Sequence, residues 1–233
     1  MNILNILKSG AVINFVLVLI GSFIGLIFKK GIPEKLKNAL FIGMALCVLL
    51  IGVDGMLEGK YNIIVVIISM ALGAVIGELI DIDKWVNKLA KKIESKFSKN
   101  SNSKIAEGFV AATLLFCVGA MTVVGSINSG ISGDNATLYS KSLIDCIAAI
   151  PLTATYGLGV MLSSVAVLAI EGFLTLFALF ISPILTEEII IHMSTIGSML
   201  IVALSLNMLG ITKIKVMNYI PAIFLPILIF AII

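Results

Sequence analysis

The sequence predicts an all-α fold, a polytopic helical membrane bundle with about eight spans, and the pattern allows seven to nine. Of its 233 residues, 60% are hydrophobic and 12% are charged, and the mean hydropathy is +1.17. A soluble domain has about a quarter of its residues charged, so this chain carries too much apolar surface for a soluble globule of its size. Its long apolar runs, such as residues 62–80, do not alternate apolar and polar residues as barrel strands do. Because backbone groups in lipid must be paired internally, the spans are helices.

The N-terminal membrane half, residues 1–83, contains three apolar runs that are long enough to cross a bilayer, at 11–28, 38–57 and 63–80. The first run lies where a secretory signal would lie. It has no small-residue cleavage site, however, and Lys residues follow it directly between residues 29 and 37. We therefore predict that it is retained as the first span.

Residues 84–106 differ from the rest of the chain and predict an amphipathic helix with a linker. Trp85, Leu89, Ile93 and Phe97 recur every four residues, so they share one helical face, and Lys residues surround that face. This pattern is typical of a helix that lies on the membrane surface. Anchoring is the simpler interpretation, and sensing of anionic lipid is the alternative. The polar residues 98–104 are typical of a flexible linker.

The C-terminal membrane half, residues 107–233, opens on an apolar helix that does not continue. Gly, Ser and Asn residues are concentrated at 125–135. They predict either an external loop or unwound backbone at membrane depth, which is tolerated only where protein or water covers it. A second apolar run follows and is broken near Pro151.

A third apolar run covers residues 156–184, and Glu171-Gly172 interrupts it, which favours a turn at that point. The sequence leaves open whether residues 134–151 and 172–185 cross the membrane or re-enter it. Further spans are predicted at 193–211 and 217–233, joined by a basic turn.

The distribution of Lys predicts the orientation, since short cytoplasmic segments are enriched in basic residues. Lys residues gather at 29–37, 84–104 and 213–215, and the chain contains no Arg. Eight crossings with both termini outside would place all three segments, including residues 84–104, in the cytoplasm.

Two short internal matches suggest repeats. Gly21 and Gly25 in the first span correspond to Gly73 and Gly77 in the third, and the Gly-x-x-x-Gly spacing allows helix backbones to approach closely. The second span and the span at 193–211 share an Ile-Gly-x-x-Leu pattern. The distribution of Lys predicts that these two spans cross the membrane in opposite directions, as in an inverted repeat. Inverted repeats around broken helices are a common transporter architecture. Convergent packing explains both matches equally well.

Polar residues inside apolar runs are the candidates for a substrate or ion site. Lys141 and Asp145 are four residues apart, so they share a helical face and can pair. Each charge at a helix centre costs about 2.5–3.5 kcal/mol on insertion scales. The alternative is a neutral structural pair. The other candidates are Ser126, Asn128, Asp134 and Asn135 in the polar stretch and the lone polar residues Asn14, Asp54 and Asn207. For each of the last three, a hydrogen bond between helices is the simpler role.

Several classes of function are excluded by the sequence. It has no His-Glu-x-x-His zinc motif, no Gly-x-Ser-x-Gly elbow and no nucleotide-binding Gly-x-x-x-x-Gly-Lys loop, so we predict no enzyme, catalytic residue, metal or cofactor. Nucleic-acid binding is not expected, because the Lys residues flank the membrane. Cys47, Cys117 and Cys146 lie in apolar runs and are interpreted as packing residues. His192, the only histidine, is expected at the surface near a helix end.

The central sequence EGFVAATLLFCVGAMTVVGSINSG, followed by LYSKSLIDCIAAI and YGLGVMLS, resembles the bacterial family known as domain of unknown function 554. GAVINFVLVLIGSFIG, IGELIDIDKW and LNMLGITKIKVMNYIPA extend the resemblance over nearly the whole chain. The resemblance implies a multi-pass protein of the bacterial cytoplasmic (inner) membrane, and transport is suspected for the family. Glu171 stands where such proteins commonly have Gln before the Gly, which makes it a further site candidate.

These observations favour a secondary transporter or exporter of a small solute or ion, with its site at broken helices near residues 125–145. The expected partners are the lipid bilayer and that solute or ion. A channel-like pore, which would need a homo-oligomer, is the first alternative. An accessory membrane protein in signalling or assembly is the second, with the amphipathic helix as its docking surface.

Overall fold

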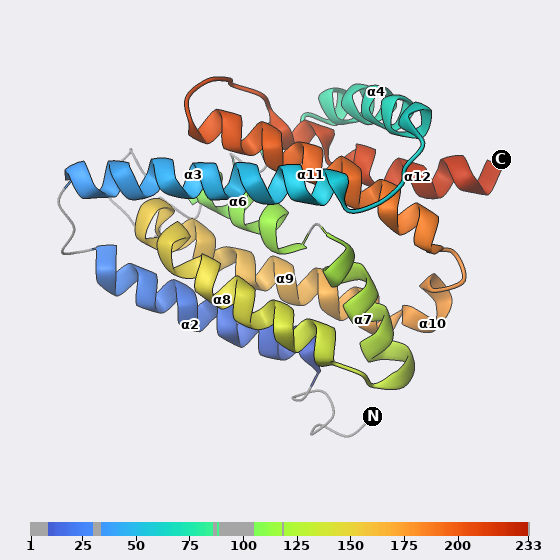
Figure 1. Cartoon of the computed structure of the whole chain (residues 1–233), viewed down its shortest axis with the longest axis horizontal. Helices are drawn as coiled ribbons and strands as arrows, with labels where there is room; N and C mark the ends of the chain where they lie inside the picture. The colour runs from blue at the N-terminus through green and yellow to red at the C-terminus, as the bar shows by residue number, and fades with distance from the viewer. Residues whose placement is uncertain (1–8, 30–33, 86–87, 89–104, 118, 233) are drawn as a thin grey trace. The chain divides into compact units, whose positions relative to one another are not determined.

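The computed structural model describes residues 9–29, 34–85, 88, 105–117 and 119–232. Within these residues every regular element is a helix (Figure 1), as the composition predicts. Most of the predicted amphipathic helix and linker lies outside the described residues. The chain forms two compact units, and each takes residues from both sides of that segment. Unit 1 comprises Met1–Phe41 and Asn100–Pro183, and unit 2 comprises Ile42–Lys99 and Ile184–Ile233.

Unit 1 is built around two parallel helices, α2 (Gly10–Lys29) and α8 (Ala136–Tyr156), which lie side by side in Figure 1. Helix α9 (Leu158–Leu176) packs against both of them and against α6 (Ile105–Cys117). Two further helices, α7 (Ala120–Ser132) and the short α10 (Ala178–Ile181), complete the unit. Helix α3 (Glu34–Leu57) begins in unit 1 and ends in unit 2.

The polar stretch at 125–135 is mostly helical, so both predicted alternatives, an external loop and unwound backbone, were wrong for most of it. Helix α7 continues to Ser132, and only residues 133–135 are irregular. The Ser132 hydroxyl donates to the carbonyl oxygen of Asn128 at 2.8 Å, so this polar side chain is satisfied within the helix. The interruption of the apolar run lies earlier, between α6 and α7, and the two helices meet at an angle of 59°.

Two other predicted breaks also lie inside helices. Helix α8 passes through Pro151 and ends at Tyr156, since a span tolerates a proline when neighbouring groups satisfy the freed backbone. Helix α9 passes through Glu171-Gly172 and ends at Leu176, so the turn favoured at that dipeptide was wrong. The Glu171 side chain is fully buried and has protein partners, so the helix can continue through it.

Unit 2 contains α4 (Ile63–Ile80), α11 (Glu187–Met208), the short 3₁₀ helix η1 (Val216–Tyr219) and α12 (Pro221–Ile232). The bounds of α4 agree with the predicted third span. Its N-cap Asn62 accepts a hydrogen bond from the Ile64 N–H at 2.9 Å. Thr186 caps α11, with Glu187 and Glu188 in the first turn, where the helix dipole favours negative charge.

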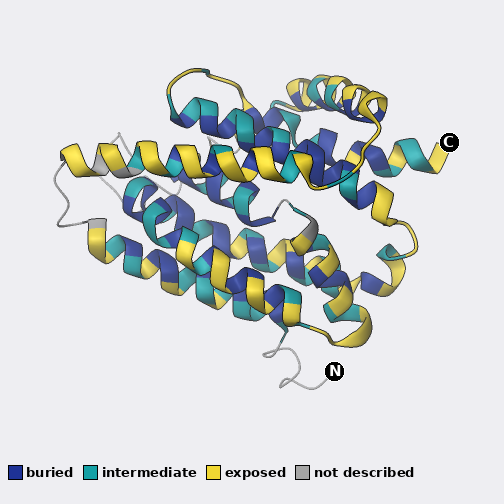
Figure 2. Cartoon of the chain, viewed as in Figure 1, coloured by how far each residue is buried: buried dark blue, intermediate teal, exposed yellow. Residues whose placement is uncertain are grey.

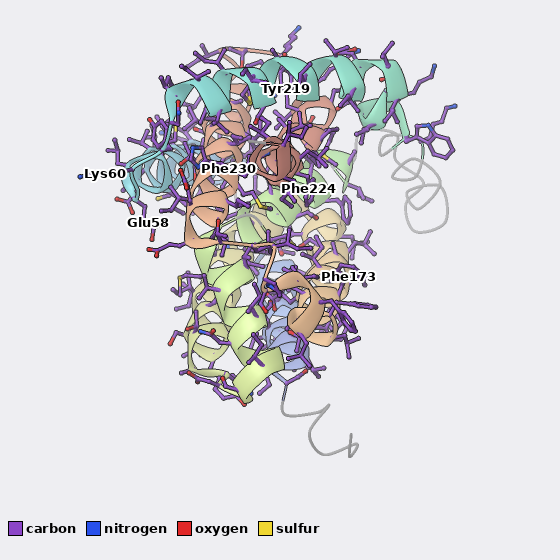
Figure 3. The ribbon with its side chains drawn as sticks, turned by 90° about the vertical axis from the view of Figure 1, so that its right-hand side faces the viewer. Glu58, Lys60, Phe173, Tyr219, Phe224 and Phe230 are labelled. Carbon is purple, nitrogen blue, oxygen red and sulfur yellow. The ribbon has the colours of Figure 1, made fainter. Side chains whose placement is uncertain are left out.

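The outer helix faces are strongly apolar, as expected where lipid is the solvent. Figure 2 shows exposed residues along these faces, and they include Leu50 and Leu79, which are 69% and 83% exposed. Phe173 on α9 and Phe224 on α12 are also exposed (Figure 3), whereas the charged Glu58 and Lys60 lie in the turn after α3. Patches of this kind on a soluble monomer would be unusual. The protein is therefore a helical membrane protein.

Four described helices are long and apolar enough to cross a bilayer: Gly10–Phe28, Ile63–Ile80, Leu158–Leu176 and Glu187–Met208. The bent pair formed by Ile105–Cys117 and Met121–Ser132 would be a fifth span. The predicted total of about eight crossings, which also counts α8 and the shorter apolar helices, stays a prediction.

Glycines allow the closest helix contacts in both units. A Cβ atom at Gly21 would meet the backbone carbonyl oxygen of Cys146, and one at Gly25 would meet that of Ile150, both on α8. In unit 2, a Cβ at Gly73 would meet Ala222, and one at Gly77 would meet the carbonyl of Asn218. The Gly-x-x-x-Gly pairs therefore lie at close helix contacts, as predicted. Whether they descend from a repeat stays a prediction.

We predict that Gly21→Ala lowers the free energy of unfolding by about 1–3 kcal/mol, because the added methyl group forces α2 away from the backbone of α8. Gly172→Ala is the matched control, since no atom lies within 4 Å of the position of its Cβ. This change should leave stability unchanged or raise it by up to about 1 kcal/mol, the helix preference for Ala over Gly. Equilibrium unfolding of the detergent-solubilised protein measures both, and equal losses would contradict the packing described.

Candidate functional site

Three charged side chains and one amide are buried together in unit 1. Lys141 and Asp145 lie one turn apart on α8, Asn14 lies on α2 and Glu171 lies on α9. Asn14 and Glu171 are 0% exposed, and Lys141 and Asp145 are 6% and 5% exposed. We call these four residues the charge cluster. Asp145 is about 13 Å from the start of α8 at 1.5 Å per residue, near the middle of the helix.

The parallel packing of α2 on α8 brings Asn14 to the charged residues. Gly10 lies against Leu138, and Gly21 lies against Cys146 and Ala149, so positions along the two helices advance together. Asn14, one turn beyond Gly10, therefore comes level with the second turn of α8. At the start of this pair, the Asn135 side-chain oxygen accepts a hydrogen bond from the Gly10 N–H at 2.8 Å.

Asn14 joins the two carboxylates. Its Nδ2 donates to Asp145 Oδ2 at 2.9 Å and to Glu171 Oε1 at 2.8 Å. Lys141 Nζ forms a hydrogen-bonded ion pair with Asp145 Oδ2 and lies 3.4 Å from Glu171 Oε1. The ammonium and the amide N–H groups therefore converge on one oxygen of each carboxylate.

The charge cluster holds one more acid than base. With all three groups ionised, Lys141 contributes one positive charge and the two carboxylates contribute two negative charges, which leaves a net charge of −1. An uncompensated charge in a low-dielectric interior costs several kcal/mol. The Lys141–Asp145 pair alone would be a sufficient structural bridge, so Glu171 is the residue that a purely structural role does not explain.

Two oxygen atoms of the charge cluster have no hydrogen-bond partner in the described part of the chain. They are Asn14 Oδ1 and Glu171 Oε2, and both belong to side chains with no exposure. Buried polar atoms are nearly always paired, so each unpaired one calls for an explanation. Both are acceptors, so a proton, a cation or a hydrogen-bond donor would complete them.

The interruption between α6 and α7 lies near the charge cluster. Cys117, the last residue of α6, lies within electrostatic range of Lys141, Asp145 and Glu171. The Thr122 hydroxyl bridges the interruption by donating to the Phe116 carbonyl at 3.2 Å. Helix ends at membrane depth provide backbone groups for ligands in broken transporter helices. The interruption therefore lies upstream of the predicted break, and its part in a binding site stays a prediction.

The predicted candidates in the polar stretch do not join the charge cluster. Asn128 and Asp134 are exposed, and Asp134 accepts a hydrogen bond from the Ala136 N–H at 3.0 Å at the start of α8. Besides the Gly10 bond, Asn135 accepts from the Ser129 hydroxyl at 2.7 Å, so it holds a helix junction. Ser126 is fully buried, and its hydroxyl has no partner among the described residues.

Asn207 and Asp54 lie in unit 2. The Asn207 amide donates to the Ile214 carbonyl at 2.7 Å and accepts from the Ile214 N–H at 2.9 Å, so it closes the turn after α11. Asp54 is exposed on α3. Asn207 thus has a local structural role, whereas Asn14, chosen by the same reasoning, binds two carboxylates.

His192 is fully buried, so the expectation of a surface position was wrong. Its Nε2 accepts the Asn62 N–H at 2.8 Å, and its Nδ1 lies 2.7 Å from the Glu188 carbonyl oxygen. Nδ1 therefore carries the hydrogen, and both ring nitrogens are satisfied. The ring also stacks edge-on against Phe230 at a centroid distance of 5.1 Å. His192 joins the starts of α4 and α11 within unit 2.

No group of three or more His, Cys, Asp or Glu side chains within the described residues could hold a metal ion.

The fold and the charge cluster define a helical membrane protein with a buried ionisable site. The chain belongs to the family described as Protein of unknown function (DUF554), which matches residues 9–231. This result confirms the resemblance found in the sequence.

Two curated relatives align over almost their full length. The chain is 32% identical over 221 residues to Uncharacterized membrane protein YdfK of Bacillus subtilis (strain 168), which covers 93% of each protein. It is 29% identical over 220 residues to Uncharacterized protein YqgA of Escherichia coli (strain K12), again over 93% of each. No solved structure matches the chain.

We predict that Asn14→Leu destabilises the protein by about 2–4 kcal/mol, because it removes two hydrogen bonds to charged groups. One such bond contributes about 1.5–3 kcal/mol to stability when it is removed singly. Asn128→Leu is the control, since Asn128 is exposed on α7, and it should change stability by less than about 0.5 kcal/mol. Unfolding in detergent measures both variants. A neutral Asn14→Leu would show that the two carboxylates do not depend on this amide.

A double-mutant cycle tests the charge balance of the cluster. Lys141→Met leaves two buried carboxylates without their cation and should cost about 3–5 kcal/mol. Adding Asp145→Asn returns the formal charge to −1, so the double variant should be more stable than Lys141→Met alone. The coupling energy between the two changes should be about 0.5–3 kcal/mol. Additive losses would contradict a shared electrostatic site.

Proposed function

We propose that this protein is a secondary transporter or exporter of a small solute or ion, and that the charge cluster is its binding site. The observation that carries the proposal is the burial of three ionisable side chains and an amide within helices of an apolar bundle. Ionisable residues at such depth are rare and costly, and they usually mark substrate or ion pathways.

The geometry adds two points in favour of transport. The cluster joins α2, α8 and α9, and α2 and α9 are candidate spans. Its two unpaired oxygens can accept a ligand, and a helix interruption lies nearby. This combination is typical of sites at broken helices in secondary transporters. A single unit of the chain supplies all four residues, so the site needs no ring of subunits, which favours a transporter over the channel-like pore.

We propose the cellular setting that the sequence predicts. The protein lies in the bacterial cytoplasmic membrane, and the Lys-rich residues 84–104 face the cytoplasm, as the positive-inside rule predicts. It acts without a cofactor and catalyses no covalent reaction.

A thermal-unfolding screen of the purified protein tests this function. The screen covers alkali and alkaline-earth cations, amino acids and small carboxylates at fixed pH. A ligand that binds only the folded state raises the melting temperature by mass action, equivalent to about 2.7 kcal/mol at 100 times Kd.

We expect at least one compound to stabilise the wild type and to lose its effect in Asp145→Asn and Lys141→Ala. Ser205→Ala is the control and should respond as the wild type does, because it removes one buried hydrogen bond, to the Ala45 carbonyl, in unit 2. If no compound stabilises the wild type and both cluster variants unfold at much lower temperature, the cluster is a structural bridge.

A further inference from the structure

We propose that Glu171 is the proton-binding residue of the charge cluster and that the protein couples transport to the uptake and release of that proton. The inference rests on the proposed function, because it names the coupling ion of the same site. The proton binds at Glu171 Oε2, and Lys141 and Asp145 remain a permanent ion pair beside it.

The hydrogen bonds distinguish the two carboxylates. Asp145 Oδ2 accepts from both Lys141 and Asn14, so Asp145 is the direct counter-ion of the lysine. Glu171 Oε1 accepts from Asn14 at 2.8 Å, but Lys141 Nζ is 3.4 Å away, beyond a normal N–H···O hydrogen bond. Glu171 Oε2 has no partner among the described residues. Glu171 is therefore the less compensated carboxylate, and its Oε2 is a fully buried oxygen without a hydrogen-bond partner among the described residues.

The charge count indicates how many protons the site takes up. With Glu171 ionised the cluster has a net charge of −1, and one proton on Oε2 brings it to zero. The step is a simple acid–base equilibrium in which a carboxylate and H⁺ give a carboxylic acid. Release to the other side of the membrane reverses it. Since a buried unpaired charge is costly, the neutral cluster is the form suited to the apolar interior.

The surroundings of Glu171 add few competing charges. Helix α8 contributes Lys141 and Asp145, and α6 contributes the Cys117 thiol. Helix α2 contributes the Asn14 amide, which does not titrate. The described sequences of α7 and α10, which also pack on α9, contain no titratable side chain. The charge state of Glu171 is thus governed mainly by the Lys141–Asp145 pair.

The cluster suits a proton better than an alkali-metal ion. A metal ion needs several oxygen ligands at once, but Asp145 Oδ2 and Glu171 Oε1 already face N–H donors, which repel a cation. Asn14, Asp145 and Glu171 each lie inside a continuous helix, so the nearby backbone carbonyls are used within the helices. A proton needs only the single vacant oxygen on Glu171.

Protonation would change how Lys141 is shared. When Glu171 is ionised, the ammonium lies between two carboxylates on different helices and holds α8 to α9. When Glu171 is protonated, the attraction between Lys141 and Glu171 is lost, and Lys141 pairs with Asp145 alone. This gives a physical link between proton binding and helix movement.

The Thr175 hydroxyl lies one turn further along α9 and is buried without a partner among the described residues. It offers a polar group for a proton that moves from Glu171 towards the end of the helix.

The test is infrared difference spectroscopy of the purified, lipid-reconstituted protein during a pH titration. A protonated carboxylic acid gives a carbonyl-stretch band that a carboxylate lacks, and the band shifts on exchange into D₂O. We expect one such band from the membrane interior in the wild type. It should be lost in Glu171→Gln, which keeps an oxygen to accept the Asn14 hydrogen bond, and it should persist in Ser205→Ala. In Asp145→Asn an ionised Glu171 alone balances Lys141, so the band should form only at lower pH than in the wild type.

Glu171→Asp is a second variant that keeps the test decisive if the glutamine variant does not fold. It keeps an acid at the site, so the band should remain and shift in frequency. Adding Na⁺ or K⁺ at constant pH and ionic strength should not remove the wild-type band. The inference is overturned if no protonated band exists, if the band is kept in Glu171→Gln, or if an alkali-metal ion displaces it.

This readout is independent of solute binding. A band on Glu171 in a protein that binds nothing in the thermal screen would support the proton site and contradict transport. A ligand in that screen without the band would support transport and overturn proton coupling.

Discussion

The structure of unit 1 depends on the balance between one buried ammonium and two buried carboxylates. Lys141 cannot lie at that depth without Asp145, and Glu171 adds a second acid that the lysine only partly compensates. Asn14 holds both carboxylates through its amide, and it reaches them because Gly10, Gly21 and Gly25 let α2 lie directly against α8. Close helix packing and the charge cluster therefore support each other. A side chain at one of these glycines would move the amide, and loss of the amide would leave two acids with fewer donors.

Unit 2 shows what buried polar groups do when their role is structural. His192 has both ring nitrogens hydrogen-bonded, and Asn207 forms a closed set of bonds with the turn that follows its helix. Gly73 and Gly77 bring α4 close to the α12 segment, as the matching glycines do in unit 1, but no buried ion pair forms among the described residues there. The two units thus share a packing device, and only unit 1 adds a cluster with surplus charge. This difference is the reason for placing the function in unit 1.

Features that depend on local spacing could be predicted from the sequence. The bounds of α4 follow from its uniform apolar run, and the Lys141–Asp145 pair follows from the four-residue spacing. The helix interruptions could not be placed, because Gly, Ser, Asn and Pro break helices in water but are tolerated where neighbours satisfy the backbone. For that reason α7 and α8 continue through Gly125 and Pro151. The partnership of Asn14 with Glu171 depends on tertiary packing across 157 positions, and the sequence signals were a lone amide and a lone acid in separate apolar runs.

The central claim is that the charge cluster moves charge across the membrane and is more than a structural bridge. The most direct test records currents from proteoliposomes on a solid-supported membrane after a rapid pH jump. The account predicts a transient current for the wild type that is absent in Glu171→Gln and unchanged in Ser205→Ala, with all three proteins folded and inserted to the same extent. A wild-type current equal to that of empty liposomes, or an undiminished current in Glu171→Gln, would contradict it.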